Sequence, residues 1–187
     1  MSDQTWWYFA RSGGIVAWVL LAASVFWGLA LSSRFLGKQP KPNWMLDLHR
    51  FLGGLAVVFT AVHVLSIVAD SYVSFGLADV LVPFGGSYHP AAVAWGIVAM
   101  YLLLAVEITS LLRKKLSKRV WKMTHFLSFP LFASATIHML WVGTDRHVPV
   151  LRYGSLLAVV GLVVLTARRV TQTEHEPVRT APTRSPA

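Results

Sequence analysis

The chain has 187 residues, of which 55% are hydrophobic and only 13% are charged, and its 17 Lys and Arg against 8 Asp and Glu give a formal net charge of +9. A soluble protein is about 45–50% apolar and about 25% charged, so this composition excludes an ordinary soluble domain and indicates a membrane protein. Cysteine is absent, which excludes disulfides, iron–sulfur clusters, zinc–thiolate sites and thioether-linked haem. Any metal must therefore be held by histidine or carboxylate.

Five apolar segments are long enough to cross a membrane, because about 20 helical residues rising 1.5 Å each span a hydrocarbon core of about 30 Å. The first is too long for the core of a signal peptide and has little positive charge before it, so we expect it to be retained. The sequence predicts an all-α, integral membrane helical bundle. The predicted spans lie near 12–33, 46–69, 90–112, 121–144 and 148–167, in a domain of residues 12–169 between an outer segment, 1–11, and a disordered tail, 170–187.

The basic residues alternate between the two ends of this predicted bundle. Fourteen of the 17 lie in the first connection, in the third connection or in the tail. The positive-inside rule places these three segments in the cytoplasm. We therefore predict a multi-pass cell-membrane protein with its amino terminus outside and its carboxyl terminus in the cytoplasm. The basic run at residues 113–122 is then explained by topology, and we expect no nucleic-acid binding.

Four of the seven histidines fall within two predicted spans. His49 and His63 are separated by 13 residues on the second span, and His125 and His138 by 12 residues on the fourth. Ionisable side chains within a membrane are costly and are functional candidates. Because both spans run in the same direction, His49 and His125 lie at the inner level and His63 and His138 at the outer level. His89 and His147 fall in outer connections and are expected to be solvated.

Two stacked metal sites follow from this arrangement. Fourteen residues advance about 21 Å along a helix and return to within about 40° of the same face, so His49 and His63 point towards one interface. A porphyrin iron has two axial positions, which two neutral imidazoles from facing helices can fill. The sequence therefore predicts two b-type haems, each with two histidine ligands to its iron.

The second histidine pair needs a distorted helix. Thirteen residues rotate His138 about 140° away from His125 on an ideal helix. Pro130 lies between them and removes one backbone hydrogen bond. We predict that a distortion at Pro130 restores the alignment.

Small and charged neighbours suit this cofactor. Gly53, with Gly54, lies one turn beyond His49, where a flat ring can approach a backbone without side chains. Arg50 is a candidate partner for the propionates of the inner haem. Further cationic candidates are Arg119 and Lys122 at the inner haem and Arg146 and Arg152 at the outer one. Glu107 either pairs with a basic residue or passes a proton.

The stretch Leu48-His49-Arg50-Phe51-Leu52-Gly53-Gly54 to His63, together with residues 116–141, resembles the ferric reductase-like transmembrane domain. That family includes ferric reductases, the NADPH oxidase membrane domain and the haem subunit of the methionine sulfoxide reductase system. The resemblance implies that His49 and His125 ligate the inner haem, and His63 and His138 the outer one. Longer members have six spans and a cytoplasmic FAD- and NADPH-binding domain. Here we expect five spans, with FAD or FMN only on a separate partner.

The leading hypothesis is transmembrane electron transfer from a cytoplasmic flavoprotein reductase or quinol to an acceptor outside. A ferric chelate, dioxygen or a redox protein would be that acceptor. Whether the chain is itself an enzyme stays open at this point. A second hypothesis is the cytochrome b anchor of a quinone-linked dehydrogenase or hydrogenase. A third, from another class, is a histidine-lined metal transporter, although few Met, Asp or Glu residues accompany the histidines.

Overall fold

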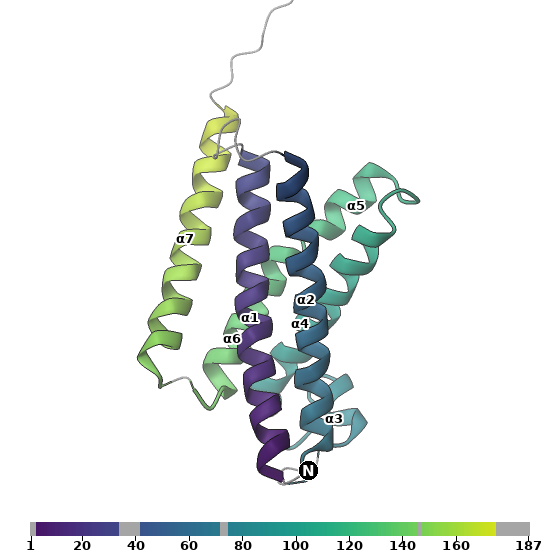
Figure 1. The fold of residues 1–187 in the computed structure, drawn as a ribbon, viewed down its shortest axis with the longest axis vertical. Coiled ribbons are helices and arrows are strands. Elements are labelled where there is room, and N and C mark those ends of the chain that lie inside the picture. The colour runs from purple at the N-terminus through teal and green to yellow at the C-terminus, as the bar shows by residue number, and fades with distance from the viewer. Residues whose placement is uncertain (1–2, 34–41, 72–74, 146, 175–187) are drawn as a thin grey trace, which may run out of the picture.

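The computed structural model of the chain describes residues 3–33, 42–71, 75–145 and 147–174. All regular structure in these residues is helical, and five helical segments are long and apolar enough to cross a membrane. This confirms the predicted all-α membrane bundle. The helices are α1 (Asp3–Ser33), α2 (Pro42–Ala69), α3 (Leu77–Leu81), α4 (Pro90–Leu111), α5 (Lys118–His125), α6 (Ser128–Val142) and α7 (Pro149–Glu174), with α5 and α6 together making the fourth span (Figure 1).

The ends of the helices extend beyond several predicted boundaries. Helix α1 begins at Asp3, so most of the predicted outer segment 1–11 is helical. Helix α7 continues to Glu174, past the predicted start of the tail at residue 170. Helix α4 begins at Pro90, where a proline in the first turn leaves no helical hydrogen bond unmade. Long helices with polar ends are expected at a membrane, because the interface beyond the hydrocarbon tolerates polar side chains.

The fourth span is interrupted close to Pro130, in agreement with the predicted distortion. Helix α5 ends at His125 and α6 begins at Ser128. Pro130 has no N–H to donate to the carbonyl of Phe126, and that carbonyl instead accepts from the N–H of Phe129 at 3.2 Å. The tighter turn breaks the span ahead of the proline. With this break, His125 faces His49 and His138 faces His63, so both rings of the fourth span face α2.

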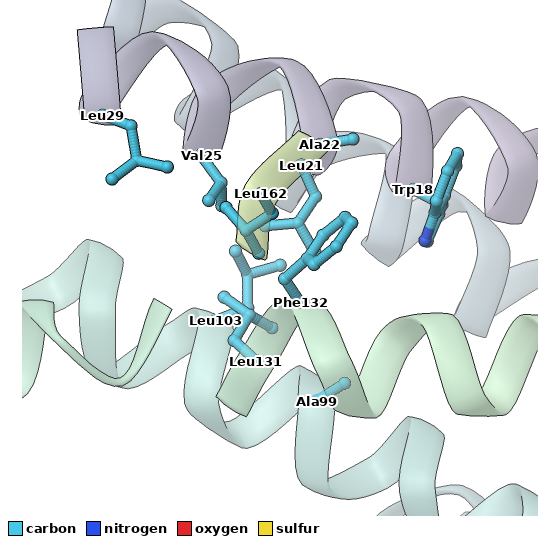
Figure 2. Packing of buried hydrophobic residues seen from close by; sticks show 10 residues of the cluster. All are labelled: Trp18, Leu21, Ala22, Val25, Leu29, Ala99, Leu103, Leu131, Phe132 and Leu162. Atoms are coloured by element: carbon cyan, nitrogen blue, oxygen red, sulfur yellow. The ribbon is translucent and has the colours of Figure 1, made fainter. Parts of the chain in front are cut away.

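Helices α1 and α2 form one antiparallel pair, and α4 packs against α6 and α5 (Figure 1). The packed core joins α1 to α4, α6 and α7, and Figure 2 shows side chains of α1 pointing towards those of α4 and α6. Trp18 of α1 stacks on Phe132 of α6 with ring centroids 6.0 Å apart and donates from Nε1 to the Thr136 hydroxyl at 3.0 Å. The core residues are Trp18, Leu21, Ala22, Val25, Leu29, Ala99, Leu103, Leu131, Phe132 and Leu162.

The outer surface of the bundle is apolar. Helix α7 exposes Val150, Leu157 and Val163, each by more than half of its surface. In water such a surface would mark an interaction site, whereas lipid requires it. The outward-facing apolar side chains and the five long helices are those of a multi-pass membrane protein.

Candidate functional site

The four histidines of the predicted spans lie in two pairs, one towards each end of the bundle. His49 of α2 faces His125 of α5, with ring centroids 5.9 Å apart and ring planes at 78°. His63 of α2 faces His138 of α6, with centroids 6.3 Å apart and planes at 78°. The structure therefore brings together the residues that the sequence placed at common levels. His89 and His147 belong to neither pair.

The separation within each pair fits one metal ion between two imidazoles. An imidazole nitrogen binds a metal at about 2 Å and the ring centre lies about 1 Å behind it, so two imidazoles on opposite sides of one ion have centroids about 6 Å apart. Both measured separations are close to this value. A direct hydrogen bond between the two rings would bring their centroids closer together.

Backbone carbonyls hold three of the four rings. A carbonyl oxygen only accepts hydrogen bonds, so each of these Nδ1 atoms carries the proton and donates. The Nε2 atom of the same ring then keeps its lone pair for a metal, which is the usual arrangement of a metal-binding histidine. The donor–acceptor pairs are His63 with Ala10 at 2.6 Å, His138 with Ala92 at 2.8 Å and His49 with Ser24 at 3.1 Å.

A glycine lies four residues after each of these carbonyls, and we call Gly14, Gly28 and Gly96 the glycine seats. A Cβ at Gly14 would lie 2.8 Å from Nδ1 of His63, and one at Gly96 would lie 2.7 Å from Nδ1 of His138. At Gly28 it would lie 3.2 Å from Cε1 of His49. A side chain at any of these positions would push the imidazole away, so the missing side chains allow the rings to reach the helix backbone.

The glycine seats were not predicted from the sequence, although the sequence contains a pattern that indicates two of them. The Ala10 and Gly14 pair is repeated 14 residues later as Ser24 and Gly28. This offset of 14 positions equals the offset between His49 and His63 on the antiparallel helix α2. Helix α1 therefore has a glycine seat at the level of each of these two histidines. Small residues four apart are common in membrane helix packing, and the repeat is recognisable only when it is compared with the histidine spacing.

A cavity of about 460 Å³ surrounds His63 and His138, within the range of about 300–1,000 Å³ of ligand pockets. Its walls are mainly apolar, and Arg11 lines it near the end of the bundle that carries the amino terminus. The guanidinium of Arg11 makes a bidentate ion pair with the buried carboxylate of Asp145. Among the described residues, Arg11 is the Lys or Arg that lines this cavity, a role that the sequence pattern does not indicate.

The other cationic candidates for this level are placed differently. Arg146 lies outside the described residues. Arg152 is exposed and lines a separate hollow with His147, Leu140 and Leu156. Their predicted contact with an outer propionate stays a prediction.

At the His49–His125 pair, the small and charged neighbours have other partners. Arg50 is exposed and pairs with Asp47 at 3.5 Å. Gly53 is buried, and the space where its side chain would lie is taken by the carboxylate of Glu107 from α4. Gly54 is exposed, and a Cβ added there would have nothing within 4 Å. The proposed roles of Arg50 and Gly53 beside a cofactor stay predictions.

The described residues contain no group of three or more His, Cys, Asp or Glu side chains that could hold a metal ion. A bare ion in either pair would thus have only two protein ligands there, fewer than a typical zinc site has. An iron in a porphyrin needs only these two, because the macrocycle supplies the other four. The donor set and the flanking glycines fit a b-type haem better than a free ion.

The family described as "Ferric reductase like transmembrane component" matches residues 13–136 of the chain. The matched region contains His49, His63 and His125 and ends two residues before His138. No significant match to a curated protein or to a solved structure was found.

Proposed function

The chain belongs to the ferric reductase-like transmembrane family, and from this premise we propose that it carries electrons across a membrane by means of two b-type haems. His49 and His125 would hold one haem, and His63 and His138 the other. Bound there, each haem would supply the reversible one-electron chemistry of its iron. The observation that carries the proposal is the pair of facing imidazoles at each level, 5.9 and 6.3 Å apart.

The two levels are spaced to serve both sides of a bilayer. His63 lies 14 positions after His49 on α2, which corresponds to a rise of about 21 Å. The hydrocarbon core is about 30 Å thick, so each pair lies towards one interface.

The chain itself supplies binding, orientation and exclusion of water. The carbonyls of Ala10, Ser24 and Ala92 fix three imidazole rings with Nε2 free. Between the glycine seats on α1, Trp18 stacks on Phe132 of α6, and Leu21, Ala22 and Val25 belong to the same buried apolar cluster. We infer that this apolar layer separates the two levels and would exclude water between them.

The direction of transfer follows from the basic residues. Six of them lie at residues 113–122, in and around the connection between α4 and α5, and the positive-inside rule places this end in the cytoplasm. The electron donor would then be a cytoplasmic flavoprotein reductase, carrying FAD or FMN, or a quinol. The acceptor would be a ferric chelate, dioxygen or a redox protein on the outer side.

The first test is the cofactor content of the purified protein. We expect two haems per chain with the Soret and α bands of low-spin b-type haem. Replacing His63 with Ala should remove one haem, and replacing His49 and His63 together should remove both. The matched control is His89→Asn, which changes an exposed histidine with a left-handed backbone that Asn tolerates. A wild-type protein without a Soret band would contradict the proposal.

The second test is electron transfer through proteoliposomes that hold ferricyanide inside. With the α4–α5 end outward, NADH plus a flavin reductase, or a quinol, should reduce the enclosed ferricyanide, and His63→Ala should abolish this. Reduction by quinol alone would favour the quinone-linked anchor. Tight binding of zinc or copper by a haem-free protein would favour the metal transporter.

A further inference from the structure

Trp121 of α5 stacks on one histidine of the proposed sites. Its ring centroid lies 5.2 Å from that of His125, and the two planes are within 22° of parallel. The guanidinium carbon of Arg113 lies over the indole, 4.6 Å from its centroid. A cation over the face of a tryptophan is attracted by the ring electrons, so Arg113 helps to hold the indole in place.

The indole N–H of Trp121 is unsatisfied within the described part of the chain. It is the buried side-chain donor that has no hydrogen-bond partner there. Two other tryptophans satisfy their N–H groups, Trp18 at the Thr136 hydroxyl and Trp27 at the carbonyl of Met45, at 3.0 and 2.9 Å. Buried donors almost always have a partner, so the Nε1 atom of Trp121 indicates an acceptor that binds beside His125.

His125 is also held differently from the other three histidines. Its Nδ1 atom has the Ser110 hydroxyl at 3.4 Å, a longer contact than the carbonyl bonds of His49, His63 and His138. It lies at the last residue of the eight-residue helix α5, which packs mainly on α4. The stack on Trp121 gives this ring the orientation that a backbone carbonyl gives the others.

We propose that Trp121 is a positioning residue of the His49–His125 site, whose indole face orients His125 and whose N–H donates to a propionate carboxylate of the haem bound there. The inference rests on the proposed function, because it needs a haem at this level. A carboxylate is a suitable acceptor for the indole N–H of Trp121, because it only accepts hydrogen bonds. An N–H bond to an ionised acceptor is also stronger than one to a neutral oxygen.

Two substitutions separate the stack from the hydrogen bond. Trp121→Phe keeps an aromatic face and removes the donor. We expect it to retain both haems with unchanged g-values in electron paramagnetic resonance. The midpoint potential of one haem should fall, because a propionate without its donor carries more negative charge and favours ferric iron. Trp121→Leu removes the face as well, and should alter the low-spin signal of one haem and reduce its occupancy.

The control is Trp95→Phe on α4, a partly exposed tryptophan outside the two pairs, which should leave both potentials and both signals unchanged. If the wild type binds two haems but Trp121→Phe leaves both potentials unchanged, the hydrogen bond is overturned. If Trp121→Leu leaves both signals unchanged, the orienting role is overturned. A wild type without haem would instead overturn the proposed function, so the two failures are distinguishable.

Discussion

At the scale of single residues, the contacts of the histidines determine what each ring can bind. A backbone carbonyl at Nδ1 fixes both the tautomer and the ring plane. The carbonyls of Ala10, Ser24 and Ala92 are accessible because a glycine follows each of them by one helical turn. The function of the glycine seats is therefore steric, and a single methyl group should disturb it.

Gly14→Ala and Gly96→Ala should each lower the haem content by about half. The new Cβ would lie 2.8 Å from Nδ1 of His63 in the first variant and 2.7 Å from Nδ1 of His138 in the second, so both variants would affect the same haem. Replacing glycine with alanine within a helix otherwise stabilises it by about 1 kcal/mol, so a loss must come from the site. The measurement is the ratio of haem to protein by pyridine haemochrome.

Gly54→Ala on α2 is the matched control for these variants. Nothing lies within 4 Å of the Cβ it would add, so its haem content should equal that of the wild type. Equal haem content in all three variants would show that the glycine seats do not position the ligands.

At the scale of elements, the sequence was sufficient for what depends on composition and spacing. Charge-free length predicted five spans, and the common direction of the second and fourth spans predicted which rings share a level. Pro130 predicted a distorted fourth span. The residue at which that span breaks depends on which N–H donates to the carbonyl of Phe126 in place of Pro130. Neighbouring N–H groups compete for this carbonyl, and residue spacing does not determine which of them binds it.

Contacts between distant helices were harder to predict. The ion pair of Arg11 with Asp145 joins residues 134 positions apart, and neither residue belongs to a recognisable motif. In the sequence Gly53 suggests space for a flat ring, whereas Glu107 fills that space from α4. Periodicity identifies the helix face on which a residue lies. The rotation and axial position of the neighbouring helix determine which side chain that residue contacts.

Pro130→Ala should weaken the alignment of His138 with His63. Alanine would restore the N–H that can bond to the carbonyl of Phe126 and would favour a continuous helix from Lys118 to Val142. His138 would then rotate away from His63, because 13 residues on an ideal helix turn it about 140° from the direction of His125. We expect about half of the haem to be lost, and a change in the low-spin spectrum of the remainder.

The thermal stability of Pro130→Ala separates this effect from misfolding. Alanine is the better helix former, so the substitution itself should not destabilise the helices. The melting temperature, followed by circular dichroism, should fall only by the amount that the loss of bound haem explains. Pro90→Ala, at the first residue of α4 where proline costs no hydrogen bond, is the control and should keep both haems. A haem content at the wild-type level in Pro130→Ala would contradict the proposed role of the helix break.

At the scale of the whole molecule, the orientation of the bundle in the membrane decides which histidine pair lies nearest the cytoplasm. His125, the partner of His49, is the last residue of α5, and Figure 1 shows α5 at the end of the bundle away from the amino terminus. The cavity at His63 and His138 is lined by Arg11 of α1, near the amino terminus. The first pair can exchange electrons with a cytoplasmic donor only if the α4–α5 end faces the cytoplasm. Orientation is thus a separate requirement of the proposed function.

The absence of cysteine makes this orientation directly measurable. A single cysteine at Ser87, in the exposed connection before α4, should react with a membrane-impermeant maleimide in intact cells. One at Lys115, in the exposed connection between α4 and α5, should react only after the membrane is permeabilised. The parent chain is the control, because it has no thiol to label.

The opposite labelling pattern would place His63 and His138 nearest the cytoplasm. Electrons from a cytoplasmic donor would then enter at the cavity beside Arg11 and leave at the α4–α5 end. The six basic residues at 113–122 would lie outside, against the positive-inside rule. Such a result would leave the two haem sites intact but reverse the proposed direction of transfer, so the labelling tests the direction independently of the cofactor.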